Sequence, residues 1–214
     1  MNWPSRKLQQ GFSLIELVVV VAIMMILSGI AIMSTARPGT TARANNAADA
    51  VVNTLRQGRL LAITKRRNVL VSLSGTNQIQ LTVQTLPGEA APAVPIPLVK
   101  LNDGIKSGLQ FYLFPTLPNT PMGPLGFGNN SALDFEAVNG GTVGNAVMFS
   151  SSGSFVGVGG TAFANYYTLG NNNPINATIF IGTPGDTTTA RAITVTGATG
   201  RVRSFYWNSV AWKE

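Results

Sequence analysis

The chain has 214 residues, of which 45% are hydrophobic and 11% are charged, so it can bury one core of ordinary size. It contains no cysteine and no histidine, which excludes disulfides, thiolate chemistry, histidine-based catalytic triads and the commonest zinc ligand. The formal net charge of +7 favours anionic partners without identifying one. We therefore expect no catalytic residue, no metal site and no cofactor.

The N-terminus has the pattern of a membrane anchor. Residues 1–11 are polar and include two basic side chains, whereas residues 17–33 carry no charge. A helix over residues 12–36 would cross a hydrocarbon core of roughly 30 Å at about 1.5 Å per residue. The basic leader should stay in the cytoplasm, which places everything after residue 37 on the other side of the membrane.

One charge, Glu16, interrupts the start of this apolar segment. An ionised carboxylate near lipid costs about 3 kcal/mol on insertion scales unless it has a partner. Cleavage between Gly11 and Phe12 would create that partner, because the new α-amino group of Phe12 lies one helical turn before Glu16. In an assembly, the amine of one subunit can neutralise the glutamate of its neighbour.

The segment GFSLIELVVVVAIMMIL resembles the cleavage and methylation signature shared by type IV pilins and type II secretion pseudopilins. The resemblance implies that a prepilin peptidase cuts after Gly11 and methylates Phe12, and that Glu16 is the glutamate at the fifth mature position. It also implies a single-pass protein of the bacterial inner membrane with its head in the periplasm, later packed through its N-terminal helix into a periplasmic or surface filament. The alternative is a plain signal anchor in which Glu16 reaches the headgroups.

Arg37, Pro38 and Gly39 predict a kink or short break in the helix, because proline lacks a backbone donor and glycine is a weak helix former. From Thr41 to Arg67 the helical pattern resumes. Its arginines fall away from an apolar stripe that should pack on a sheet, formed by Ala44, Ala48, Val51, Leu55 and Ala62.

The remaining chain alternates with the period of strands. Residues 68–84 predict a β-hairpin around a Ser-Gly-Thr-Asn turn. Further strands are predicted within residues 104–114, 145–155, 174–182, 191–196 and 200–207. Proline-rich surface loops are predicted at residues 85–97 and 115–130.

These elements predict an α+β fold in which a long protruding N-terminal helix packs on a β-rich antiparallel head. The predicted parts are the leader 1–11, the transmembrane helix 12–36, the amphipathic helix 37–67 and the globular head 68–214. The order of elements resembles the GspH and FimT branch of the pilin-like family, through the stretches LRQGRLLAITKRRNVLVSL, MFSSSGSF and ITVTGATGRVR. GspH proteins are minor pseudopilins at the tip of the type II secretion filament, and FimT-like proteins are minor pilins, some of which bind DNA.

Arg201 and Arg203 are the candidate ligand-binding residues of the head. Positions i and i+2 of a strand share a face, so the two guanidinium groups could bridge phosphates of a nucleic acid. FimT-like DNA-binding pilins carry a GRxR motif that these residues match, beginning at Gly200. The alternative is an edge strand kept soluble by its charges.

Three other clusters have simpler interpretations. The basic residues 65–67 suit the negative end of the helix dipole. Asp134 and Glu136 are too few to hold Ca²⁺, which takes six to eight oxygen ligands. Residues 150–154 are serine-rich and predict a polar turn.

We therefore expect a non-enzymatic filament subunit whose partners are prepilin peptidase, other pilin-like subunits and the inner membrane. DNA is the alternative partner. A membrane-anchored exported enzyme is the remote alternative, which the absence of histidine, cysteine and suitably paired acids disfavours.

Overall fold

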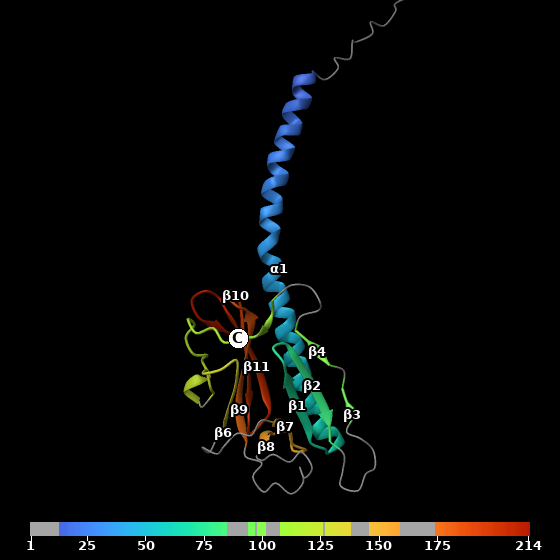
Figure 1. The fold of residues 1–214 in the computed structure, drawn as a ribbon, viewed down its shortest axis with the longest axis vertical. Helices are drawn as coiled ribbons and strands as arrows, with labels where there is room; N and C mark the ends of the chain where they lie inside the picture. The colour runs from blue at the N-terminus through green and yellow to red at the C-terminus, as the bar shows by residue number, and fades with distance from the viewer. Residues whose placement is uncertain are drawn as a thin grey trace, which may run out of the picture. The chain divides into compact units, whose positions relative to one another are not determined.

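The computed structural model describes residues 13–84, 94–96, 98–101, 108–125, 127–137, 146–158 and 174–214. The chain divides into two compact units, residues 1–39 and residues 40–214, which we treat separately and call the N-terminal unit and the globular unit. A helix followed by antiparallel sheets makes the fold α+β, as predicted (Figure 1).

Helix α1 runs from Leu14 to Lys65 and contributes to both units. It begins after Ser13, whose carbonyl accepts hydrogen bonds from the backbone N–H groups of Glu16 and Leu17. The predicted break is absent, because residues 37–39 are helical. A proline inside a helix costs about 3 kcal/mol, whereas nucleating a second helix costs about 4 kcal/mol, so a continuous helix is the less expensive outcome.

The C-terminal end of α1 closes with a Schellman arrangement. The backbone N–H of Arg67 donates to the carbonyl of Ala62 at 3.1 Å, and that of Arg66 donates to Ile63 at 3.3 Å. Arg66 has a φ of 51°, a left-handed conformation that glycine usually supplies. The end of the helix was thus predicted to within two residues.

The apolar stripe of α1 is buried as predicted, with Ala44, Val51, Leu55 and Ala62 at 0% exposure. It forms one hydrophobic core with side chains of two antiparallel sheets. Full burial of a valine or leucine side chain contributes about 1.5–3 kcal/mol. The helix is therefore held by both sheets at once.

Within the described residues, the first sheet has the strand order β3-β2-β1-β7-β8, with β4 also paired to β2. The predicted hairpin is confirmed as β1 and β2, in register from Val69 opposite Val83 to Ser74 opposite Gln78. The strands are β1 (Val69–Ser74), β2 (Gln78–Val83), β3 (Val94–Pro95), β4 (Val99–Lys100), β7 (Ala146–Phe149) and β8 (Phe155–Val158).

The second sheet has the order β12-β11-β10-β9-β5, with β6 also paired to β9. Its central strands β9, β10 and β11 confirm the predictions for residues 174–182, 191–196 and 200–207. The strands are β5 (Gln110–Phe111), β6 (Leu133–Ala137), β9 (Ile175–Thr183), β10 (Asp186–Thr196), β11 (Arg201–Trp207) and β12 (Trp212–Lys213).

This second sheet is buried on both faces. One face contributes Ile193, Val195 and Val202 to the core shared with α1. The other contributes a smaller cluster that includes Phe205 and is packed by part of the segment 112–122. The indole Nε1 of Trp212 donates to the carbonyl of Pro118 at 2.8 Å, which ties this segment to the C-terminal strand.

Several predictions needed correction. The strand expected within residues 104–114 is only β5 among the described residues, and residues 145–155 form a hairpin rather than one strand. Strand β6 lies in a segment for which we predicted no strand. The loop 115–130 includes a short 3₁₀ helix, Gly123–Leu125, and a buried Phe127. Most of the loop predicted at residues 85–97 lies outside the described residues.

Candidate functional site

The predicted processing site lies at the very start of the chain. Gly11 and Phe12 are outside the described residues, so their geometry is not described. Glu16 lies in the first turn of α1 and its side chain is exposed. Helix α1 thus begins two residues after Phe12 and carries the Glu16 carboxylate in its first turn.

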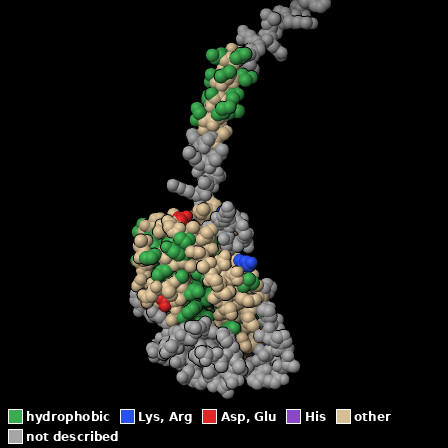
Figure 2. Space-filling model, viewed as in Figure 1, with side chains coloured by type: hydrophobic (Ala, Val, Ile, Leu, Met, Phe, Trp, Pro, Cys, Tyr) green, Lys and Arg blue, Asp and Glu red, His purple; other side chains and the backbone are tan. Residues whose placement is uncertain are grey.

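The described side chains at the start of α1, from Leu14 to Leu27, are largely apolar and exposed (Figure 2). The large hydrophobic residues from Leu14 to Leu27 are 41–82% exposed. An apolar surface of this extent marks a site of contact with lipid or protein. Within the described residues, no helical stretch is both long and apolar enough to cross a membrane; the predicted segment 12–36 includes side chains at 29–36 that lie outside the description.

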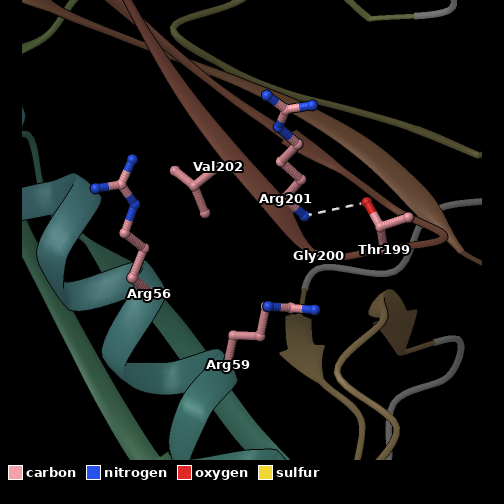
Figure 3. Close-up of a pocket in the computed structure, with 6 residues that line it drawn as sticks. All are labelled: Arg56, Arg59, Thr199, Gly200, Arg201 and Val202. Carbon is pink, nitrogen blue, oxygen red and sulfur yellow. Dashed lines mark hydrogen bonds between the residues drawn. The ribbon is translucent and has the colours of Figure 1, made fainter.

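A basic groove of about 550 Å³ lies in the globular unit, between α1 and the start of β11. Its described lining contains three arginines and no carboxylate: Arg56, Arg59, Thr199, Gly200, Arg201 and Val202. Figure 3 shows Arg56 and Arg59 projecting from the helix, Arg201 from the strand, and Val202 between Arg56 and Arg201. We call this the arginine groove.

Three segments that are distant in the sequence meet at one end of the arginine groove. Arg59 donates from Nε to the carbonyl of Gly153, in the β7–β8 turn, at 3.3 Å. Gly200, in the β10–β11 turn, has a φ of +62°, and a Cβ there would lie 2.1 Å from the Gly153 carbonyl oxygen. The backbone N–H of Phe155 donates to the carbonyl of Gly197, which joins the two turns. Only glycine permits this contact at position 200.

The structure places Arg201 and Arg203 in different surroundings. Arg201 is exposed and lines the groove. Arg203 is half-buried; its Nε lies 3.8 Å from Glu214 and its Nη1 lies 3.8 Å from the sulfur of Met122. Arg203 is therefore less available than Arg201 to bridge phosphates, because the C-terminal residue and the segment around Met122 cover its face of the sheet.

Arg191 is a buried cation that the sequence pattern did not single out. It is 3% exposed, and its Nε donates to Asn45 of α1 at 2.8 Å while Nη1 donates to the carbonyls of Thr188 and Ala190. Burial lowers the pKa of Arg191, and the nearby Tyr206 opposes this shift. The side chain fastens β10 to the helix.

The remaining candidate clusters have structural roles. The carboxylate of Asp134 accepts a hydrogen bond from the backbone N–H of Asn130 at 2.6 Å, and the side chain of Glu136 lies outside the described residues. The predicted polar turn is confirmed: hydroxyl groups of Ser150, Ser152 and Ser154 are hydrogen-bonded to one another. Lys65 is the last residue of α1.

Sequence reasoning missed Arg56 and Arg59 as parts of the site. Their spacing away from the apolar stripe was correctly recognised, but it indicates only that they avoid the core. A signal did exist, because the segments containing Arg59, Gly153 and Gly200 were the same three stretches that resemble the GspH and FimT branch. Nothing in their spacing indicates that they meet.

The family model of the prokaryotic N-terminal methylation motif matches residues 6–32. The chain thus carries the methylation motif of prepilin-type proteins, as predicted. No curated protein matches the chain significantly.

The solved structures similar to this chain include the following two. The type IV minor pilin FimU of Pseudomonas aeruginosa (strain PAO1) matches with 13% identity and a TM-score of 0.38, over 79% of this chain and 92% of its own. The minor pseudopilin EpsH from the type 2 secretion system of Vibrio cholerae matches with 16% identity and a TM-score of 0.37, over 76% of this chain and 95% of its own.

Gly200→Ala should destabilise the globular unit by about 2–4 kcal/mol, because it adds a clash with the Gly153 carbonyl to the strain of a positive φ. Urea unfolding followed by circular dichroism measures the change. Gly185→Ala is the matched control, since Gly185 has a φ of +82° and nothing within 4 Å of the added Cβ. It should cost only about 1 kcal/mol. Equal losses in the two variants would contradict the proposed close approach.

Proposed function

We propose that this chain is a minor pilin or minor pseudopilin, a structural subunit of a type IV pilus-like or type II secretion filament. The observation that carries the proposal is the methylation motif at residues 6–32, within which helix α1 begins at Leu14 and bears Glu16 in its first turn. The resemblance to the GspH and FimT branch supports a minor subunit rather than the main filament component.

Processing and placement follow from the same motif. We propose that prepilin peptidase cuts the precursor between Gly11 and Phe12 and methylates Phe12. Residues 12–36 then anchor the protein as a single span of the bacterial inner membrane, with the globular unit in the periplasm. The exposed apolar residues of the first half of α1 need such an environment, because in water they would favour aggregation.

Assembly depends on the charge at Glu16. In an apolar helix bundle, an unpaired carboxylate is expensive, and the mature N-terminal amine of a neighbouring subunit can neutralise it. The exposed side chain of Glu16 at the start of α1 is accessible to such a neighbour. This pairing would set the axial register between subunits.

The first prediction of this proposal concerns processing. Intact-mass measurement of the membrane-purified protein should show an N-terminus at Phe12 carrying one added methyl group. Gly11→Glu should leave the precursor uncut, because the peptidase must accommodate residue 11 beside the scissile bond. A mature N-terminus after residue 36 in the wild-type protein would instead indicate an ordinary secretory signal.

The second prediction concerns assembly. Glu16→Ala should be inserted and cleaved normally but should enter filaments at least about tenfold less efficiently, since a lost charge pair of about 1.4 kcal/mol corresponds to that factor. Quantitative immunoblotting of sheared filaments against membranes measures the ratio. Asp49→Ala is the control, because Asp49 is an exposed carboxylate of the same helix within the globular unit. Normal incorporation of Glu16→Ala would remove this role from Glu16.

We propose no catalytic role for the protein. The clusters that could have suggested one have structural roles: Asp134 shapes its own loop, and the serine hydroxyls of the β7–β8 turn bond to one another. A hydrolase screen of the purified protein tests the alternative of an exported enzyme, which reproducible turnover would support.

DNA binding is a second candidate function, and the exposure of Arg201 in a groove with two further arginines favours it. Exposed arginines bind phosphates and release counterions, which gives weak attachment that depends strongly on salt. Arg203 is less suited to this role than the GRxR motif suggests, because Glu214 lies beside it. DNA phosphates would then contact the arginines of the groove rather than the Arg201–Arg203 pair.

The third prediction concerns DNA binding. Binding of duplex DNA by the full-length protein is measured in nonionic detergent at several salt concentrations. Arg201→Gln should flatten the slope of log affinity against log salt by about 0.9, the contribution of one phosphate contact. Arg203→Gln should change the slope less. An unchanged slope in Arg201→Gln, or no binding by the wild-type protein at low salt, would exclude DNA as a ligand of this site.

A further inference from the structure

The edge of the second sheet beside the arginine groove is unpaired over part of its length. Strand β11 runs from Arg201 to Trp207, but β12 pairs only with Tyr206 and Trp207. Residues 201–205 of β11 therefore have β10 on one side and, within the described residues, no strand on the other. We call residues 201–205 the free edge.

The register shows which backbone groups face outward. The N–H of Asn208 donates to the carbonyl of Ala211 at 3.2 Å, on the side of β12. Successive residues of an antiparallel strand direct their backbone groups to opposite sides. Tyr206, Ser204 and Val202 therefore direct their N–H and C=O groups toward the β12 side.

At Val202 and Ser204 these outward groups have no hydrogen-bond partner among the described residues. Unpaired backbone groups of a strand edge are a template for another strand. The space beside Val202 is the arginine groove, of about 550 Å³. The unpaired backbone at Val202 therefore lies beside this groove, although the residue as a whole is only 7% exposed, whereas Ser204 is half-buried and does not line the groove.

Arginines lie on both sides of this edge near its start, and Glu214 is a carboxylate farther along, beside Arg203. Arg56 and Arg59 lie on the helix side of the groove. The side chain of Val202, in β11, faces the core that the second sheet shares with this helix. Arg201 points to the opposite face of the sheet, as strand alternation requires. A strand added to the free edge would have arginines beside both of its faces.

We propose that the free edge binds an extended, acidic polypeptide segment of another protein as an added β-strand. Backbone hydrogen bonds to Val202 and Ser204 would supply attachment, and acidic side chains beside Arg56, Arg59 and Arg201 would supply selectivity. Five residues of edge extend about 17 Å, which matches a segment of five or six residues. The inference concerns the globular unit alone and does not depend on filament assembly.

A polypeptide fits the site better than a nucleic acid does. A nucleic acid would use the arginines but would leave the backbone groups of Val202 and Ser204 without the regularly spaced partners that a strand provides. The two occupants differ in a measurable way, because only the strand requires the outward N–H groups of β11.

The test uses fluorescence anisotropy of the full-length protein in nonionic detergent at low salt. The probe is a fluorescein-labelled, end-blocked hexapeptide of sequence Val-Glu-Glu-Val-Glu-Glu, which carries glutamates on both faces of an extended strand. Two control probes are the same peptide with glutamine for glutamate, and a version methylated on alternate backbone nitrogens. We expect the acidic probe to bind and each control to bind about tenfold more weakly or worse.

Ser204→Pro is the decisive variant. Proline at 204 removes the outward N–H but leaves the bonds that its neighbours make to β10, and edge strands tolerate proline with its nitrogen facing outward. We expect about tenfold weaker binding of the acidic probe. Ser204→Ala keeps the N–H and should bind as the wild-type protein does.

Arg56→Gln should also weaken binding by about threefold to tenfold, whereas Arg43→Gln, an exposed arginine of the same helix outside the groove, should not. Should Ser204→Pro fail to fold by circular dichroism, the methylated probe on the wild-type protein decides the same point. Binding that is insensitive to backbone methylation would show a purely ionic site, as a nucleic acid would use, and would overturn the proposal. No binding of the acidic probe at low salt would also overturn the proposal. The arginines would then serve only to prevent edge-to-edge aggregation of the strand.

Discussion

The globular unit depends on the apolar stripe of α1, which both sheets share as a common core. Val51 and Leu55 are fully buried, in one cluster with Val71 and Leu81 of the first sheet and Ile193 and Val195 of the second. Each sheet covers the helix, so neither can shift without exposing side chains worth about 1.5–3 kcal/mol each. The buried Arg191, bonded to Asn45, adds a directional link between the second sheet and the helix. This arrangement leaves the flank of the helix that carries Arg56 facing the groove.

The arginine groove follows from that constraint and from two glycines. With the helix held against both sheets, the β7–β8 and β10–β11 turns approach so closely that Gly200 and the Gly153 carbonyl leave no room for a side chain. Arg59 bonds to this junction through its Nε. The result is a concentration of positive charge beside a strand edge whose backbone groups are unpaired. Binding of anions and binding of an acidic strand are two uses of the same surface, and they differ in whether the backbone takes part.

The two units differ in the surfaces that their described residues expose. The N-terminal unit has apolar side chains exposed along the helix and a carboxylate at its start, so it needs partners that are apolar and carry one positive charge. The globular unit buries an apolar core shared by α1 and both sheets, and its described surface combines the charged groove with scattered exposed apolar side chains such as Leu60, Leu125 and Val210. The filament subunit that we propose would use this division, because its helix would leave water while its globular part would stay in contact with water.

The sequence by itself determined the parts of this protein that depend on neighbours along the chain. The methylation motif around Gly11, the apolar helix, the buried stripe and the hairpin of β1 and β2 all follow from local spacing, since period and capping are properties of consecutive residues. Tertiary structure alone decided which arginines lie together. Alternation correctly placed Arg201 and Arg203 on one face, but it carried no information on the Glu214 that lies beside Arg203 or on the helix that brings Arg56 and Arg59 to the edge of β11. Those distances are set by how the helix packs between the sheets, and packing brings together side chains that local periodicity treats as independent.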